Sequence, residues 1–182
     1  MQNKEVFIKL SERYNMEQYI KPLEELGFFN APASSKYHLN YKGGLLEHSL
    51  NVFKLMIKLK EIYKIDVTEK DIFLCAFLHD LDKVMKYTPK IINGATIYIW
   101  DDWLGLDNGV GSVILAKEIG INLSRDVRIA IVNHMGFWEI NNFKEKANSI
   151  KRFIYAWDLL TLLRHADEGA TFCIEKDKNI KG

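Results

Sequence analysis

Hydrophobic and polar residues recur along most of the chain with helical spacing, and turn-forming residues separate these stretches. Apolar residues that return every three or four positions predict amphipathic helices. Gly, Pro, Ser and Thr mark where such helices start and stop, and Thr68 and Ser124 are the expected N-caps of two of them. The pattern therefore predicts an all-α bundle. The expected helices cover one or two segments within 4–26, then 45–63, 68–87, 109–119, 124–135 and 149–167.

Two segments interrupt this pattern. Residues 31–44 carry Pro32, neighbouring serines and paired glycines, which predict an irregular loop. Asn93 and Gly94 stand between short β-branched runs, the chemistry of a two-residue hairpin turn. We therefore expect one short β-hairpin near residues 91–100.

Nothing in the sequence divides the chain into separate units, because it contains no internal repeat and no linker rich in Pro, Gly or Ser. The prediction is one domain over 1–182, with a core at about 35–172 and a helical extension at 1–30 packed on it. The charged tail 175–182 is expected to fray.

Composition narrows the class of protein only a little. With 48% hydrophobic residues in 182, the chain can bury one substantial core. Its formal net charge of +1 gives no argument for nucleic-acid, membrane or acidic-protein binding. Cys75 and Cys173 lack CxxC spacing and are expected to be free thiols. Without an apolar span or leader, the prediction is a cytoplasmic protein with no membrane partner, and a homo-oligomer is compatible with the sequence.

His48 is the first residue on a predicted helix whose side chain could bind a metal. It shares a face with Val52, Leu55 and Leu59, so its ring should point inward. An inward histidine needs a partner. Taken alone, this pattern is more typical of a core histidine with a satisfied hydrogen bond than of a metal ligand.

The next helix carries a stronger signal. The unbroken apolar run at 72–78 delivers His79 and Asp80 into the interior. Burying a carboxylate without a partner costs several kcal/mol. Asp80 therefore needs a metal ion or a buried ion pair with Lys83 or an arginine, and the adjacent His79 favours the metal.

The last predicted helix offers two carboxylates, Asp158 and Asp167. They are nine positions apart and, at about 100° per residue, project from opposite sides of the helix. Only one can face a shared site. Periodicity does not choose between them, and a cap or an ion pair is an alternative for either.

Four motifs, GGLLEHSLNV, AFLHDLDK, IVNHMG and LLRHADEGAT, follow one another in this order. Together they resemble the H…HD…D signature of the HD superfamily over about residues 35–172. The chain is similar in particular to small bacterial and phage HD proteins and to the HD domain of certain bacterial 3′-to-5′ exoribonucleases. The resemblance implies an HD-domain helical bundle with one divalent metal ion, which could be Mn, Fe, Ni, Co, Zn or Mg. The implied metal ligands, which include Asp167 rather than Asp158, are His48, His79, Asp80 and Asp167.

The resemblance also implies an activity. A metal-dependent phosphohydrolase would cleave a phosphoester of a nucleotide or short nucleic acid through a metal-activated water. Asp80 would orient or deprotonate that water, and Lys83 would neutralise a phosphate oxygen unless it is merely a solvated lysine. His134 matches a histidine that contacts phosphate or a second metal in relatives, and it completes the expected catalytic set. The expected substrate contacts are Lys83, His38, Asn108 and His134.

Two departures from the family pattern bear on this hypothesis. Where relatives tend to read GHGEKS, residues 107–112 read DNGVGS, so Asn108 and Val110 replace a histidine and a glutamate. A second metal is therefore in question. Asp82 stands where relatives have glycine, and it either changes the charge balance at the metal or faces solvent.

These departures keep a second function open, a catalytically weak or inactive HD-fold module that binds a nucleotide or a protein partner. Aromatic residues near the predicted mouth of the site could stack on a base or simply pack. They are Trp100, Trp103, Phe137 and Trp138.

Overall fold

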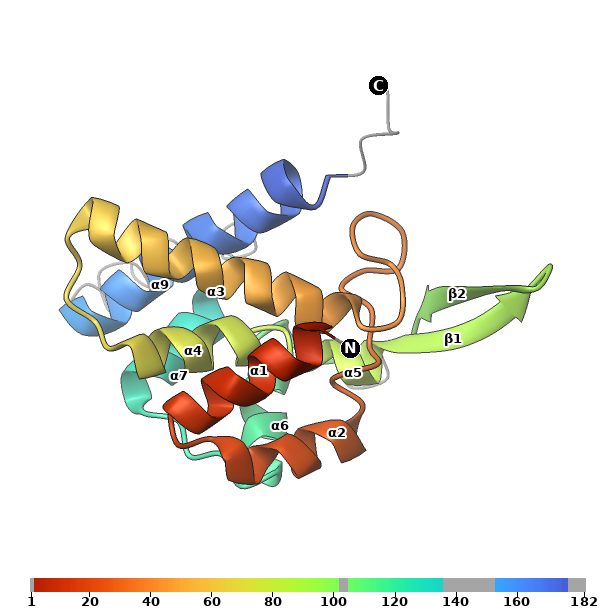
Figure 1. Cartoon of the computed structure of the whole chain (residues 1–182), viewed down its shortest axis with the longest axis horizontal. Coiled ribbons are helices and arrows are strands. Elements are labelled where there is room, and N and C mark those ends of the chain that lie inside the picture. Colours follow the sequence, from red (N-terminus) through yellow and green to blue (C-terminus); the bar gives the residue numbers. More distant parts are fainter. Residues whose placement is uncertain (1, 102–104, 136–152, 177–182) are drawn as a thin grey trace.

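The structure, a computed structural model, describes residues 2–101, 105–135 and 153–176. These residues form a helical bundle from which a single hairpin projects (Figure 1), so the expected all-α class is confirmed. In chain order the described elements are α1 (Gln2–Arg13), η1 (Glu17–Tyr19), α2 (Ile20–Leu26), α3 (Gly44–Tyr63), α4 (Glu69–Leu78), α5 (Lys83–Lys86), β1 (Tyr87–Ile92), β2 (Ala95–Trp100), α6 (Val110–Glu118), α7 (Arg125–Asn133), α9 (Ile154–Gly169) and the π-helical turn η2 (Ala170–Ile174).

Capping residues set the starts of two helices as the sequence predicts. The Thr68 hydroxyl accepts a hydrogen bond from the backbone N–H of Asp71 at 3.1 Å. The Ser124 hydroxyl accepts one from the N–H of Val127 at 3.2 Å. Each bond satisfies a donor that the first helical turn leaves without an intrahelical partner.

Helix α4 lies at the centre of the bundle. Every residue from Ile72 to Leu78 is buried, because α4 packs against α3, α7 and α9. On another side it meets α1, where the Phe7 ring lies 5.9 Å from that of Phe73 and 5.0 Å from that of Phe77, between centroids. Helix α9 runs beside α3 (Figure 1). The end of α4 is thereby enclosed between these helices.

The expectation of one helix over 68–87 is wrong. Helix α4 ends at Leu78, turns occupy the next four residues, and strand β1 already begins at Tyr87. The backbone N–H of Asp82 donates to the Ser112 hydroxyl at 3.1 Å instead of continuing the helical ladder. The hairpin is correspondingly longer than expected, although its turn at Asn93 and Gly94 is as predicted.

The irregular loop before α3 is held against the start of that helix. A Cβ atom on Gly44 would lie 1.9 Å from the carbonyl oxygen of Leu39, so only glycine permits this approach. As a result, the ring of His38 lies 5.3 Å from that of His48, between centroids.

Two further expectations concern the thiols and the membrane. Cys75 and Cys173 are both free, as predicted. Among the described residues, none of the helices has the length and apolar character needed to cross a membrane.

Candidate metal centre

Four side chains from distant parts of the chain converge at the end of α4. The Nε2 atom of His48 lies 3.3 Å from Nε2 of His79, 3.1 Å from Oδ1 of Asp167 and 3.7 Å from Oδ2 of Asp80. His79 Nε2 is 3.2 Å from the Asp80 oxygen and 4.0 Å from the Asp167 oxygen. We call these four residues the metal cluster.

The other nitrogen of each clustered histidine has a fixed partner. His79 Nδ1 lies 3.0 Å from the carbonyl oxygen of Ala76, which can only accept, so Nδ1 carries the proton. His48 Nδ1 lies 3.0 Å from Oε2 of Glu175, and in the same way donates to it. In the neutral rings, both Nε2 lone pairs therefore point into the cluster.

This arrangement fits a divalent cation. Two imidazole lone pairs and two carboxylate oxygens repel one another at these distances unless a proton or a cation lies between them. Donor atoms bound about 2.0–2.2 Å from one ion lie roughly 3 to 4 Å from each other, which is the spacing observed here. His48, His79 and Asp167 of the cluster have the geometry to hold an ion, and so do His79 and Asp80 together with His134, which lies beside the cluster.

The protonation behaviour of the cluster points the same way. Burial acts to lower the pKa of His48, but hydrogen bonds to Asp167 and Glu175 outweigh it and raise the pKa to about 9. Burial acts to raise the pKa of Asp80, but the charges of Lys83 and His79 hold it well below its usual range. The surroundings of His48 thus favour a positive charge, and Asp80 stays ionised as a carboxylate donor.

A cavity of about 360 Å³ opens next to the metal cluster. Lys83 lines it and lies 2.6 Å from Oδ2 of Asp80, so the ion pair weighed for Asp80 does exist beside the clustered histidines. Burial acts to lower the pKa of Lys83, but Asp80 outweighs it and raises this pKa. Lys83 is therefore a largely buried cation on the cavity wall and not a solvated lysine. The other lining residues expected at the site are His38, Asp80, Trp100, Asn108, His134 and Asp167.

His134 faces the same cavity with an atom that has no hydrogen-bond partner among the described residues. Its Nδ1 lies 2.6 Å from the carbonyl oxygen of Ile131, whereas Nε2 is buried and 3.7 Å from Oδ1 of Asp80. His38 also lines the cavity. Burial and the positive charges of His48 and Lys83 lower the pKa of His38 to about 4.

Asp82 neither faces solvent nor joins the metal cluster. Its carboxylate is fully buried, 2.8 Å from Nζ of Lys86, and accepts a hydrogen bond from the Ser112 hydroxyl at 3.0 Å. Lys86 also donates to Oδ1 of Asn108 at 2.5 Å. We call Asp82, Lys86, Asn108 and Ser112 the lysine network. Asn108 therefore lines the cavity, and its amide oxygen accepts the hydrogen bond from Lys86.

The structure separates the two candidate carboxylates of α9. Asp167 belongs to the metal cluster, whereas Asp158 has none of its contacts there, and partial burial raises its pKa. Of the aromatic residues expected near the mouth, Trp100 lines the cavity and makes an edge contact with Tyr87 at 5.4 Å between centroids. Trp103, Phe137 and Trp138 lie outside the described residues.

One residue of this site was missing from the sequence prediction. Glu175 was assigned to a fraying tail because the residues after it are mostly charged, but its side chain is buried against His48. It also accepts a hydrogen bond from the amide of Asn51 at 2.9 Å. The signal available in the sequence was weak, an apolar run at 172–174 immediately before the glutamate.

The fold and the cluster define a helical protein whose candidate divalent-metal site is built from histidines and aspartates of separate helices. The HD domain family matches residues 45–171, so the chain belongs to this family, whose members bind divalent metals, and the resemblance noted in the motifs is confirmed.

A curated relative adds to this finding. The dihydroneopterin 2′,3′-cyclic phosphate phosphodiesterase of Methanocaldococcus jannaschii is 30% identical over 128 residues, which cover 68% of this chain. The aligned part is 48% of the relative, so the chain spans about half the length of that protein. No solved structure matches the chain.

Proposed function

We propose that the chain is a divalent-metal-dependent phosphohydrolase that cleaves a phosphoester of a nucleotide or a short nucleic acid. The observation that carries this proposal is the convergence of the metal cluster beside a cavity that also contains Lys83. A site that combines electron-rich donors with a buried lysine suits a phosphate group, because the phosphate contacts a bound cation on one side and an ammonium on the other.

The roles of the individual side chains follow from their positions. A divalent ion, when bound, supplies Lewis acidity and lowers the pKa of water. Asp80 is placed to accept a proton from the attacking water, and Lys83 to neutralise a phosphoryl oxygen. The Nδ1–H of His134 donates to Ile131, so its buried Nε2 atom can accept a hydrogen bond from a substrate hydroxyl when the ring is neutral and donate one to a phosphoryl oxygen when the ring is protonated. In hydrolysis, the water oxygen bonds to phosphorus, the ester P–O bond breaks, and the leaving oxygen takes up a proton.

The proposed substrate class rests on the relative and on the cavity. The relative is named for the 2′,3′-cyclic phosphate of dihydroneopterin, a cyclic phosphodiester of a molecule that carries a heterocycle. Trp100 on the cavity wall adds an aromatic surface for the organic part of such a substrate. Nucleoside 2′,3′-cyclic phosphates are therefore the first substrates to test, followed by nucleoside monophosphates and short oligonucleotides. The set of candidate ions stays Mn, Fe, Ni, Co, Zn and Mg, because two nitrogen and two oxygen donors suit several of them.

The test combines metal analysis with activity. Purified protein is stripped with a chelator, reloaded with each candidate ion and assayed against these phosphoesters. We expect His48→Ala and Asp80→Ala to lose about 10²–10⁴-fold in kcat/KM. Matched controls come from residues of the same types outside the site. His165 is exposed and pairs with Tyr63, and Asp158 lies on the same helix as Asp167. His165→Ala and Asp158→Asn should keep wild-type activity.

Two results would contradict the proposal. Activity that persists in both His48→Ala and Asp80→Ala would place the hydrolysis elsewhere or in a contaminant. Tight binding of a metal without hydrolysis of any of these phosphoesters would instead support the binding module, with the cluster in a structural role.

A further inference from the structure

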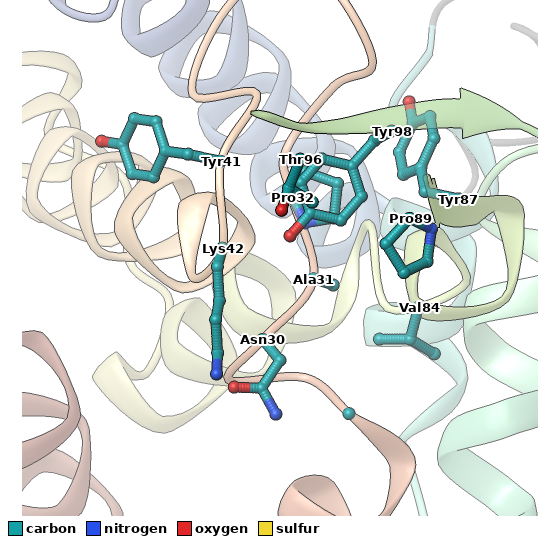
Figure 2. Close-up of a pocket in the computed structure, with 11 residues that line it drawn as sticks. Asn30, Ala31, Pro32, Tyr41, Lys42, Val84, Tyr87, Pro89, Thr96 and Tyr98 are labelled. Carbon is teal, nitrogen blue, oxygen red and sulfur yellow. The ribbon is translucent and has the colours of Figure 1, made fainter. Parts of the chain in front are cut away.

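A second cavity lies beside the one that opens next to the metal cluster, which we call the metal cavity. It has a volume of about 480 Å³ and is enclosed by the loop before α3, by α5 and by the hairpin (Figure 2). This volume lies in the range of about 300–1,000 Å³ that is usual for small-molecule sites. The lining residues used below are Asn30, Pro32, Lys42, Tyr87, Pro89 and Tyr98.

The two cavities lie next to each other, and both the hairpin and the loop before α3 contribute residues to each of them. Tyr87 lines both of them. In the loop, Ala31 and Pro32 line the second cavity, and the next two residues, Ala33 and Ser34, line the metal cavity. Only one stretch of loop and one tyrosine therefore separate them.

The register of the hairpin makes this connection continuous. Tyr87 pairs with Trp100, and Pro89 pairs with Tyr98. Residues opposite each other, and residues two apart on one strand, lie on the same face of a sheet. The Tyr87 and Trp100 pair borders the metal cavity, and the Pro89 and Tyr98 pair borders the second cavity. One face of the hairpin thus leads from one cavity to the other over about 7 Å.

The chemistry of the second cavity differs from that of the first. The ring of Tyr98 reaches across toward Pro32 (Figure 2), and with Pro89 these residues offer flat, mostly apolar surfaces. Asn30 adds an amide that both donates and accepts hydrogen bonds, and Lys42 adds a positive charge. Among the described residues that line it there is no Asp or Glu. This combination suits a planar nitrogen heterocycle attached to an anionic group.

We propose that the second cavity binds the heterocyclic base of the phosphoester whose phosphate lies in the metal cavity, with Tyr98 as the stacking surface and Asn30 as the hydrogen-bonding group. This inference rests on the proposed function, because it assumes a nucleotide-like substrate. The ribose would lie along the shared hairpin face, past Tyr87. Charged groups concentrate in the metal cavity, whereas the described lining of the second cavity combines aromatic and amide groups with no Asp or Glu.

The test compares two esters that differ only in the base, adenosine 2′,3′-cyclic phosphate and 1-O-methylribose 2,3-cyclic phosphate. The ratio of their kcat/KM values should fall about 10-fold in Tyr98→Ala, because stacking on an aromatic ring contributes on that scale. Tyr98→Phe should keep the ratio, because the ring remains, and Asn30→Ala should lower it by a smaller factor. Tyr37→Ala is the matched control, because Tyr37 is 76% exposed in the same loop and lines neither cavity.

Equilibrium binding of adenosine 5′-monophosphate, followed by calorimetry, tests the cavity without relying on hydrolysis. We expect Tyr98→Ala to weaken this binding about 10-fold relative to wild type. An unchanged Kd in Tyr98→Ala, or equal use of the two esters by wild type, would overturn the proposal. If wild type binds the nucleotide through Tyr98 but hydrolyses neither ester, the proposed function fails and the base site stands.

Discussion

Two groups of buried charge lie next to each other in the turn after α4, and they are neutralised in different ways. The lysine network contains its own cation, because the Lys86 ammonium lies 2.8 Å from the Asp82 carboxylate. The metal cluster directs two imidazole nitrogens and two carboxylate oxygens at one another. Lys83 lies 2.6 Å from one Asp80 oxygen and neutralises part of this charge, but the two imidazole nitrogens and Asp167 still need a proton or an ion from solution between them.

This difference separates what holds the fold from what acts on a substrate. A buried charge that is compensated by its own chain contributes to folding and cannot exchange its partner. A buried group of donors that its own chain compensates only in part can bind and release a ligand, and here it opens onto a cavity. The two groups are only two residues apart in sequence, at Asp80 and Asp82, so sequence position alone does not distinguish them. Substitutions in each group should therefore affect different measurements.

The largest expected effect comes from removing the internal cation. Lys86→Met leaves the fully buried Asp82 carboxylate without its ammonium partner. Breaking a buried pair from one side costs about 3–5 kcal/mol. We expect the free energy of unfolding to fall by that amount in a urea titration followed by circular dichroism.

The double variant Asp82→Asn/Lys86→Met is the control for this prediction. It removes both charges and keeps similar shapes, so it should recover a large part of the lost stability. A Lys86→Met protein within about 1 kcal/mol of wild type would mean that the pair is not a buried, self-contained unit.

The next effect concerns the metal cluster through a residue that does not belong to it. Glu175 accepts a hydrogen bond from the Nδ1–H of His48, and this bond fixes Nε2 as the nitrogen that faces the cluster. Losing the charge of such a partner typically weakens metal binding about 10–100-fold. We expect Glu175→Gln to raise the Kd of the metal by this factor in a chelator competition. The exposed glutamate at the other end of α3 provides the control, and Glu61→Gln should bind metal as wild type does.

In that experiment the stability of the metal-free protein separates two explanations. If Glu175 acts by orienting His48, unfolding in the presence of chelator should change much less than metal affinity. An equal loss of stability in the chelated protein would mean that Glu175 only ties the C-terminal turn to the bundle.

Sequence patterns predicted the parts of the molecule that depend on local rules. Helical periodicity and the caps at Thr68 and Ser124 gave the helices, and Asn93 with Gly94 gave the hairpin turn, because each depends on residues close in sequence. Periodicity also pointed His48 inward. It could not choose between Asp158 and Asp167, because both are compatible with the helix, and only the family motif favoured the one that joins the cluster.

The parts that sequence patterns missed depend on contacts between distant segments. After α4 the backbone continues in tighter turns, and the N–H of Asp82 donates to Ser112, thirty residues later, instead of to the chain four residues back. Glu175 is ordered by His48, 127 residues earlier. Asp82 was expected near the metal or in solvent, but it pairs with Lys86, four residues on, in the lysine network. No local rule predicts which distant helix supplies a hydrogen bond.

The smallest predicted effect tests whether the lysine network is a connected unit. Ser112 is fully buried, donates to Oδ1 of Asp82 and accepts from its backbone N–H. Ser112→Ala leaves that N–H and that oxygen each without a partner, at a cost of about 1–3 kcal/mol. The cost should lie at the low end, because Lys86 still neutralises the carboxylate, and metal affinity should not change.

Ser11 is the matched control, since it is equally buried but its hydroxyl only donates to Phe7 O, four residues back in α1. Ser11→Ala leaves no group unpaired because that carbonyl already accepts within the helix, so its unfolding curve should stay close to that of wild type. Equal losses in the two variants would mean that Ser112 contributes only packing, and that Asp82 and Lys86 form an isolated pair.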